Sequence, residues 1–377
     1  MLTKDRLLPI RLFTLALTLA LIWIIKQPGL VALLFAGMAL GATLNYFMFG
    51  FSSSWRRCIL SHQTAGVRAQ IIMLAGALIL FTPLFWLESW GSLQFQGIIR
   101  PAGLSVMLGA FLFGIGMQFA ANCSSGTLNR VGQLQPLSFV SFIMLFVGGA
   151  LGAYFYNSWG HWWALAPYSI TLNWKLAGLL LSLTTLLVIY VGLIRLEKNN
   201  RQTLEPLWSR NEPKPFSPFL IAALLLVVFS GLILFLSGQP WSVATVFTLW
   251  SFKFSDQFNL GLDWEFWQIA QLYQHRIAEP LLADPISLTT LGVILGSLWV
   301  TLLAKKPIKK QTISPKQTAY YALGGLLMGF GATLSYGCNI GAFFSGIASG
   351  SLHGWLWIIF ALLGNLVALL WLRDRND

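Results

Sequence analysis

The chain has 377 residues, of which 56% are apolar and only 10% are charged, and it carries a formal net charge of +12. Soluble domains carry about 25% charged residues, so this composition excludes an ordinary soluble domain and indicates a protein that crosses a lipid bilayer several times. The basic residues lie in short loops between apolar segments, which is a topology signal, so we expect no nucleic-acid partner.

The first predicted element is an apolar run at 12–25, which follows Lys4, Arg6 and Arg11. A basic start and a short apolar run resemble a signal peptide. However, the sequence continues as Lys26-Gln-Pro-Gly, without the small residues that mark a cleavage site. We therefore expect an uncleaved first span.

Further apolar segments follow along the chain, and each is close to the ~20 residues that a helix needs to cross the hydrocarbon core. With the first, they lie at 12–25, 29–50, 68–87, 102–121, 137–157, 176–196, 218–237, 286–304, 319–336 and 354–373. The sequence therefore predicts an all-α polytopic membrane protein with about ten transmembrane helices.

The charges of the loops predict how these spans are oriented. Segments 197–217 and 305–316 are rich in Lys and Arg, as cytoplasmic loops are, whereas 238–285 is acidic and is expected outside. Alternation of the spans then places both termini in the cytoplasm. The Trp and Phe residues within 238–285 suit either helices that lie in the membrane interface or an ordinary packed loop.

Two stretches, 109–126 and 324–341, repeat one pattern of glycines and a cysteine at a constant offset (338 − 123 = 215). The matched pairs are Gly109/Gly324, Gly114/Gly329, Gly116/Gly331, Cys123/Cys338 and Gly126/Gly341. So many coincidences at one offset indicate an internal repeat. Because loop charge makes 102–121 run inward and 319–336 run outward, we expect two inverted repeats, as in many transporters.

The repeat divides the chain into three predicted parts. These are a first membrane repeat at 1–196 with an extra N-terminal span at 12–26, a cytoplasmic linker at 197–217, and a second membrane repeat at 218–377. The glycines before each cysteine allow two helices to approach closely, and for Gly109 and Gly324 we expect a packing role alone.

The segments that follow Cys123 and Cys338 are short and broken by glycines, so we expect short re-entrant half-helices that enter the membrane partway and turn back. Irregular backbone at that depth is stable only where protein or a water-filled cavity satisfies it. The N-termini of half-helices present free N–H groups and a positive dipole end, which favour an anion. The predicted substrate site comprises Cys123, Cys338, Asn122, Ser124, Ser125, Asn339 and Gly337.

A neutral thiol is a weak S–H donor, so two thiols would contact a polarisable sulfur anion without adding repulsive charge. One buried cysteine alone is more simply a small apolar residue, but two at matched repeat positions favour a functional role. The sequence offers no carboxylate pair, phosphate loop or intramembrane pair of histidines, and Cys58 with His62 provides too few ligands for a metal. We therefore expect no metal, no other cofactor and no enzymatic activity.

Three further residues have open interpretations. Arg56 and Arg57 either attract anions at the inner mouth or anchor the chain on its positive, cytoplasmic side. His353 begins a predicted span, so we expect it at the membrane interface.

The stretches around the two cysteines, 113–127 and 329–355, resemble the YeeE/YedE family of sulfur transporters. The resemblance covers both halves of the chain, roughly 27–150 and 318–373. It implies a permease of the bacterial inner membrane that imports thiosulfate, a small inorganic anion, through an hourglass-shaped protein whose cysteines contact the substrate. YedE-like members are associated with selenium metabolism, so a selenium compound is implied as an alternative substrate.

The sequence departs from the family pattern at one position, because Gly50 stands where the family usually has a third cysteine. Cys58 lies eight residues later (58 − 50 = 8), so the family's third thiol is not transferred to it. Thiosulfate is the best single expectation, while another sulfur oxyanion or a sulfide-like species stays open. A different class is a protein that holds a persulfide on Cys123 or Cys338 and hands it to a cytoplasmic sulfur-carrier protein.

Overall fold

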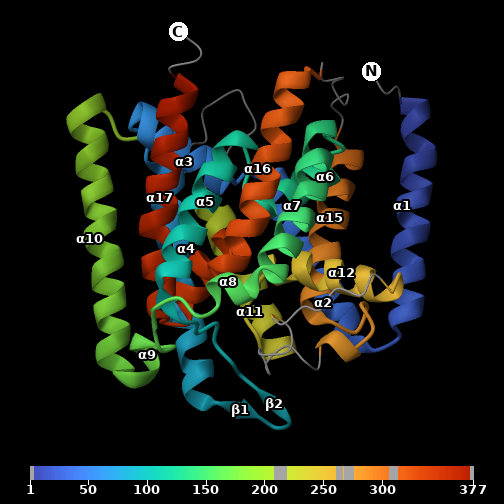
Figure 1. Cartoon of the computed structure of the whole chain (residues 1–377), viewed down its shortest axis with the longest axis horizontal. Helices are drawn as coiled ribbons and strands as arrows, with labels where there is room; N and C mark the ends of the chain where they lie inside the picture. The colour runs from blue at the N-terminus through green and yellow to red at the C-terminus, as the bar shows by residue number, and fades with distance from the viewer. Residues whose placement is uncertain (1–3, 208–218, 260–265, 267–275, 305–312, 374–377) are drawn as a thin grey trace.

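The computed structural model of the chain describes residues 4–207, 219–259, 266, 276–304 and 313–373. Its long helices run between two ends of the molecule (Figure 1). They are α1 (Lys4–Ile25), α2 (Pro28–Tyr46), α4 (Ala65–Leu87), α5 (Leu104–Phe119), α7 (Pro136–Tyr154), α10 (Lys175–Arg201), α11 (Phe219–Ser237), α15 (Pro285–Leu303), α16 (Pro315–Leu334) and α17 (Leu352–Arg373).

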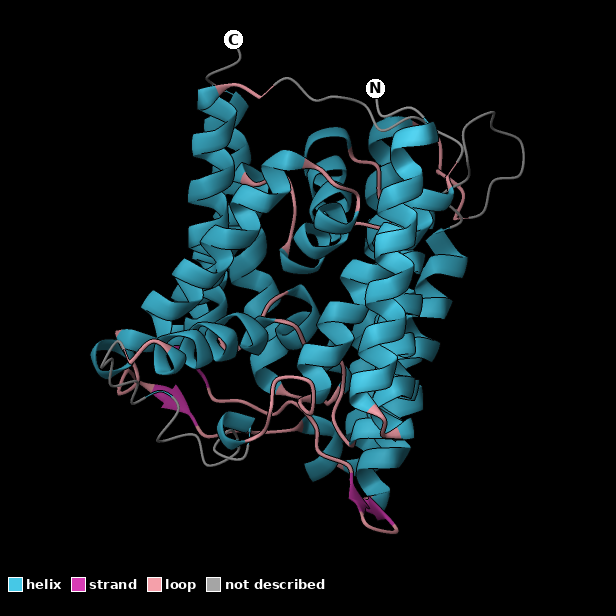
Figure 2. Ribbon diagram, turned by 90° about the vertical axis from the view of Figure 1, so that its right-hand side faces the viewer, coloured by secondary structure: helices cyan, strands magenta, loops and turns pink. Residues whose placement is uncertain are grey.

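Shorter elements fill the space between the long helices and connect them. The short helices are α3 (Phe51–Ser61), α6 (Ser124–Gly132), α8 (Tyr156–Trp159), α9 (Ile170–Asn173), α12 (Ala244–Gln257) and the π-helix η1 (Asn339–Gly346). Two small antiparallel pairs join β1 (Ser89–Trp90) to β2 (Leu93–Gln94) and β3 (Ala102–Gly103) to β4 (Ala164–Leu165). Figure 2 shows these strands at one end of the bundle and short helical turns enclosed between the long helices near the other.

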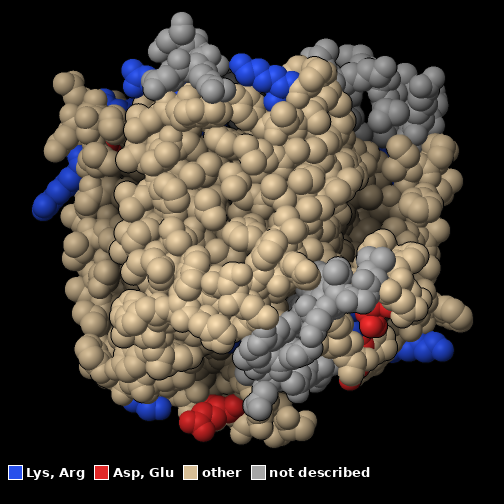
Figure 3. All heavy atoms as spheres, viewed as in Figure 1, with Lys and Arg blue, Asp and Glu red and all other residues tan. Residues whose placement is uncertain are grey.

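Each of the predicted apolar segments coincides with one long helix among the described residues. Within the described part of the chain, nine stretches of helix are long and apolar enough to cross a bilayer, and the bent pair of α16 and η1 would make a tenth. Lys, Arg, Asp and Glu gather at the two ends in Figure 3, and the flank between them is uncharged. A charge-free band of this kind fits the hydrocarbon core, so the predicted all-α polytopic class is confirmed.

The short helices after the cysteines continue the spans that precede them. The run Leu104–Gly132, which contains α5 and α6, forms one candidate span of 29 residues. Helices α16 and η1 meet at a bend of 41°. The chain therefore reverses only after each short helix, and the predicted re-entrant character of these segments stays a prediction.

Both chain termini lie at one end of the molecule, here called the terminal end (Figure 1). Helix α12 and the strands lie toward the opposite end, where loop charge placed the segment 238–285. Helix α12 runs across the long helices and packs on α7, α15 and α16 through buried Phe247 and Leu249, as a packed loop would. The second part of the linker, 208–217, and residues 305–312 of the basic segment lie outside the described residues, as do Trp264 and Trp267.

Helices α5 and α16 form the centre of the bundle and touch through backbone. A Cβ atom added to Gly109 would lie 2.6 Å from the carbonyl oxygen of Gly331, and one added to Gly116 would lie 2.6 Å from that of Gly324. The contact is reciprocal, because 109 + 215 = 324 and 116 + 215 = 331. Only glycine permits this approach, which agrees with the packing role expected for Gly109 and Gly324.

The flanking contacts are reciprocal as well. Helix α5 packs on α17 and α16 packs on α7. In the first contact, a Cβ atom added to Gly114 would lie 2.2 Å from the carbonyl oxygen of Ala361. In the second, one added to Gly329 would lie 2.3 Å from that of Leu145. The offset is 215 for the glycines (329 − 114) and 216 for their partners (361 − 145). Each helix of the central pair therefore has an equivalent neighbour on its outer side.

Candidate functional site

The backbone breaks in the same way before both cysteines. Ala121 and Tyr336, each two residues before a cysteine, have φ angles of +52° and +54°. A left-handed conformation costs a residue with a side chain about 1–2 kcal/mol, so the surrounding structure must hold it in place. After it the chain is extended at Cys123 and Cys338, and each cysteine then begins a short helix.

Matched backbone hydrogen bonds close both breaks. The N–H of Asn122 donates to the carbonyl of Met117 at 3.0 Å, and the N–H of Gly337 donates to that of Ala332 at 2.8 Å. These bonds satisfy carbonyl groups that the last turn of a helix leaves free. Two of the predicted site residues, Asn122 and Gly337, therefore act through their backbone at the joint.

The Cys123 thiol caps the N-terminus of α6. Its Sγ accepts a hydrogen bond from the N–H of Gly126 at 3.3 Å and lies 3.3 Å from the Oγ of Ser125. The side chain is only 2% exposed. Cys123 and Ser125, both predicted site residues, therefore form one hydrogen-bonded unit at the positive end of a helix.

The Cys338 thiol begins η1 and is fully buried. Unlike Cys123, its side chain makes no capping hydrogen bond to the helix that it begins. Helices α6 and η1, which begin at Cys123 and Cys338, touch each other. The structure thus brings the starts of both short helices, and their cysteines, into one region of the interior.

Two of the predicted residues present buried polar atoms that have no hydrogen-bond partner in the described part of the chain. These atoms are the Oγ of Ser124 and both the Oδ1 and the Nδ2 of Asn339. Each residue has no exposed surface, and an unsatisfied buried polar group costs about 1–3 kcal/mol. Such groups are retained where water or a ligand completes them. The Asn122 amide differs, because its Nδ2 donates to the carbonyl of Ala120 at 3.2 Å.

A cavity of about 440 Å³, here called the inner cavity, reaches Cys123 from the half of the molecule nearer the terminal end (Figure 1). It lies between the end of α2, the start of α3, and α6. Its lining includes Gly50, Arg57, Asn122, Cys123 and Arg130. The sequence analysis had singled out the first four of these residues separately, but nothing in their spacing predicted a shared cavity.

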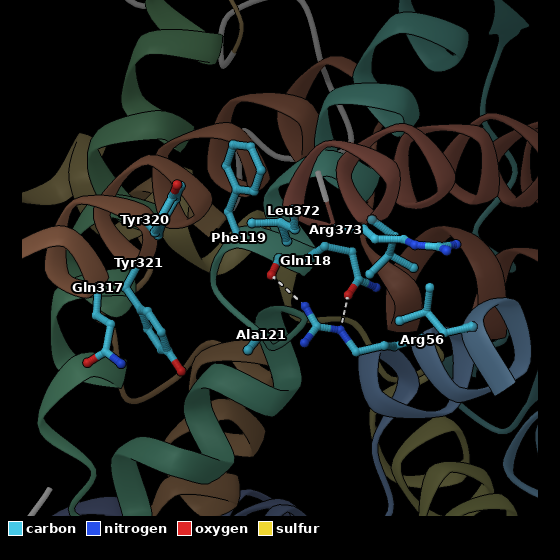
Figure 4. Close-up of a pocket in the computed structure, with 11 residues that line it drawn as sticks. Arg56, Gln118, Phe119, Ala121, Gln317, Tyr320, Tyr321, Leu372 and Arg373 are labelled. Carbon is cyan, nitrogen blue, oxygen red and sulfur yellow. Dashed lines mark hydrogen bonds between the residues drawn. The ribbon is translucent and has the colours of Figure 1, made fainter. Parts of the chain in front are cut away.

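A second cavity of about 420 Å³ lies beside the inner cavity and shares Ala121 with it. Figure 4 shows the guanidinium of Arg56 directed at Gln118 inside this cavity. The Nε of Arg56 donates to the Oε1 of Gln118 at 2.9 Å, and the amide of Gln118 donates in turn to Asn365. This buried chain of polar groups ties α3, α5 and α17 together, and the sequence analysis missed it.

His353 is fully buried inside the protein, while its expected depth at the membrane interface stays a prediction. Its Nδ1 lies 2.6 Å from the Oγ of Ser351, and a Cβ added to Gly346 at the end of η1 would lie 2.8 Å from its ring. The fold after η1 encloses the imidazole, which the position of His353 at the start of a span did not reveal. Cys58 is a free, half-buried thiol on α3.

Known proteins resemble the chain over most of its length. The profile of a family described as Sulphur transport matches residues 48–367. The chain is 28% identical to the thiosulfate transporter TsuA of Spirochaeta thermophila, over 88% of this chain and 96% of that protein. It is 25% identical to the thiosulfate transporter TsuA of Escherichia coli, over 88% and 93%, respectively.

A more partial similarity links the chain to the probable transporter YedE of Escherichia coli, with 28% identity over 40% of this chain and 36% of that protein. The family profile spans far more than half of the chain and includes both cysteine joints. The protein is therefore a multi-pass membrane protein that belongs to the sulphur transport family, the YeeE/YedE family of its sequence motifs.

Proposed function

We propose that the protein imports a small inorganic sulfur anion across the bacterial inner membrane, with thiosulfate as the first choice, and that Cys123 and Cys338 contact it in turn. The supporting observation is that both thiols begin buried short helices beside Ser124 and Asn339, whose polar atoms lack partners among the described residues. The thiosulfate transporters that the chain matches over 88% of its length support the choice of substrate.

An inverted repeat would explain how two distant parts of the sequence build one passage. The reciprocal glycine contacts of α5 and α16 are what a pseudo-two-fold axis in the membrane plane requires. The same axis would relate the break before Cys123 to the break before Cys338. Each half then supplies one thiol near the midplane.

The chemistry proposed is contact without covalent bonding, so the protein is a transporter and not an enzyme. A neutral S–H donates weakly to the anion, and the helix N-termini add partial positive charge without holding the anion permanently. Ser125 lies 3.3 Å from the Cys123 sulfur, and Asn122, Ser124 and Asn339, which adjoin the two cysteines in sequence, are proposed to offer the anion further hydrogen bonds. A cytoplasmic sulfur-carrier protein is a proposed recipient of the imported sulfur.

The proposal is tested by uptake of radiolabelled thiosulfate into cells that lack other uptake routes. Cys123→Ala and Cys338→Ala should each abolish most uptake, while Cys58→Ala, which removes the free thiol of α3, should leave it unchanged. Immunodetection in the membrane fraction confirms that each variant is present. Undiminished uptake by the double variant Cys123→Ala/Cys338→Ala would refute the relay.

A selenium compound is the alternative substrate, because the chain also matches YedE proteins, though over only 40% of its length. Competition separates the two substrates: selenite in excess should leave thiosulfate uptake intact if thiosulfate is the substrate. A persulfide-transfer protein would need an accessible thiol, whereas Cys123 and Cys338 are almost entirely buried. A persulfide trapped on either cysteine and detected by mass spectrometry would favour that function.

A further inference from the structure

We propose that the inner cavity is an anion-binding station, in which Arg57, Arg130 and the N-terminus of α3 receive the substrate from Cys123, and that it restricts transport to charged oxyanions. This inference rests on the proposed function and concerns the same passage. In this proposal, positive charge and backbone dipoles hold the anion in the last step before it is released at the terminal end.

The charge of the cavity is entirely positive. Arg57 and Arg130 line it, and none of its lining residues is acidic. Within the described chain, the ion pairs are those of Arg68 and Arg201 with Glu197 and of Arg276 with Asp284, so no carboxylate neutralises either lining arginine. Two half-buried cations facing one cavity attract an anion more strongly than they would in open solvent.

The orientation of the cavity's helices adds to this charge. Helix α3 has 11 residues, and its N-cap residue, Gly50, has no side chain that could cap the first N–H groups of the helix. The cavity is lined by Gly50, Phe51, Ser52 and Ser53, which form the whole first turn of α3. Free N–H groups of that turn therefore face the same space as the arginines. Helix α6 likewise begins at the cavity, with Cys123 as its N-cap.

A buried amide points independently to a ligand. Asn129 lines the cavity and is 7% exposed, and its Oδ1 has no hydrogen-bond partner within the described structure. The oxygen and nitrogen of an amide exchange places by a half-turn of the side chain, so Asn129 can present a donor to an anion. Asn122, Gln133 and Gln135 line the same cavity and supply further amide groups.

The position of Arg57 is fixed by packing. Its guanidinium lies 5.6 Å from the centre of the Phe219 ring, which also lines the cavity. This contact orients the cation without neutralising it. A volume of about 440 Å³ leaves room for a small oxyanion with part of its hydration shell. A neutral sulfide species gains nothing from such a site, whereas a dianion gains from both arginines.

Binding to the purified full-length protein in nanodiscs tests the station without requiring transport. Isothermal titration calorimetry with sodium thiosulfate and with sodium sulfate is expected to detect binding that weakens as NaCl is raised. Arg57→Gln and Arg130→Gln should each weaken it about tenfold or more, the usual effect of losing a hydrogen bond to a charged group. Arg130→Lys should retain most of the affinity because it retains the charge.

Controls separate the cavity from general surface charge and from misfolding. Arg195→Gln removes an exposed arginine of α10 near the terminal end and should leave the affinity unchanged. A variant counts as folded when its thermal unfolding and gel-filtration profile match those of the unaltered protein. Equal affinity in the double variant Arg57→Gln/Arg130→Gln, or an equal loss in Arg195→Gln, overturns the proposal.

The binding and uptake assays test the anion-binding station and the thiol relay independently. Cys123→Ala removes a thiol but no charge, so it should retain anion binding while uptake is lost. If binding depends on the arginines but uptake does not depend on the cysteines, the station holds and the relay is refuted. If uptake depends on the cysteines but the arginine variants bind both anions normally, the relay holds and the station is refuted.

Discussion

The surroundings of Cys123 and Cys338 share one backbone design but differ in access. Both cysteines come after a left-handed residue and begin a short helix. Cys123 lines the inner cavity of about 440 Å³ and has Ser125 as a side-chain partner, whereas Cys338 lines neither that cavity nor the one beside it and makes no capping hydrogen bond with its side chain. The repeat thus sets where each sulfur lies, and the neighbouring elements set what can reach it.

The largest expected effect tests the design that the two surroundings share. Gly109→Leu and Gly324→Leu place side chains against the backbone of the facing helix, where a Cβ alone would approach to 2.6 and 2.5 Å. Both should prevent stable folding, since the clash exceeds ordinary overpacking, which costs about 1–3 kcal/mol. Yields of monodisperse protein after purification measure this loss.

The matched control is Gly192→Leu, because Gly192 on α10 is exposed and nothing lies within 4 Å of an added Cβ. That variant should fold normally. If only one of Gly109→Leu and Gly324→Leu disrupts folding, the two halves of the central contact are not equivalent, and the pseudo-two-fold proposal weakens.

The next effect concerns a buried ion pair, Arg276 with Asp284, in the half of the chain that contains Cys338. Buried Asp284 accepts two hydrogen bonds from Arg276, at 2.6 and 3.0 Å, and Arg276 also donates to the hydroxyl of Thr245 in the first turn of α12. Asp284→Asn should lower the free energy of unfolding by about 3 kcal/mol or more, because it leaves a buried charge unpaired. Thermal unfolding measures the loss, and Asp256→Asn, at an exposed site on α12, is the control.

The same pair predicts a pH dependence. Burial alone would raise the pKa of Asp284, but hydrogen bonds and charge from Arg276, with hydrogen bonds from Ser287, hold that pKa below its usual value. The stabilisation is therefore present above the unfolded pKa of about 3.9 and is lost as the pH falls through the lower, folded value. The unaltered protein should lose stability in that range, and Asp284→Asn should show a flatter profile there.

A smaller effect distinguishes a ligand-binding amide from a structural one. Asn365 donates to the carbonyl of Ala361 at 2.7 Å and accepts from Gln118, whereas Asn339 has no partner among the described groups. Asn365→Leu should lower stability by about 1–3 kcal/mol, since it leaves the buried Nε2 of Gln118 without its acceptor. Asn339→Leu should leave stability unchanged or raised, yet thiosulfate uptake should fall. A loss of stability in Asn339→Leu would show that its amide is structural.

The smallest expected effect measures access to the two thiols directly. In a Cys58→Ala background, a small maleimide should modify Cys123 about tenfold faster than Cys338, equivalent to about 1.4 kcal/mol in activation free energy. The reason is that only Cys123 lines the inner cavity. Rates come from mass spectrometry of timed samples, with Cys123→Ala and Cys338→Ala assigning the products. Equal modification rates of Cys123 and Cys338 would contradict the proposed difference in access between the two thiols.

Hydropathy was sufficient to predict the long helices, and the glycine pattern indicated close helix packing without showing which helices meet. These features depend on local composition and on periodicity, which a single sequence displays. The burial of His353, the Arg56–Gln118–Asn365 chain and the inner cavity were not predictable. Each depends on side chains from helices far apart in the sequence, and no local pattern encodes which of them meet.

The π-helical form of η1 has a consequence for how alike the two halves can be. From Cys123 to the start of α7 the chain advances 13 residues (136 − 123), and from Cys338 to the start of α17 it advances 14 (352 − 338). A wider helical turn absorbs one surplus residue without shifting the next helix. The extra residue beside Cys338 is therefore accommodated locally, so the segments after the two cysteines can differ while the matched packing of α5 and α16 is preserved.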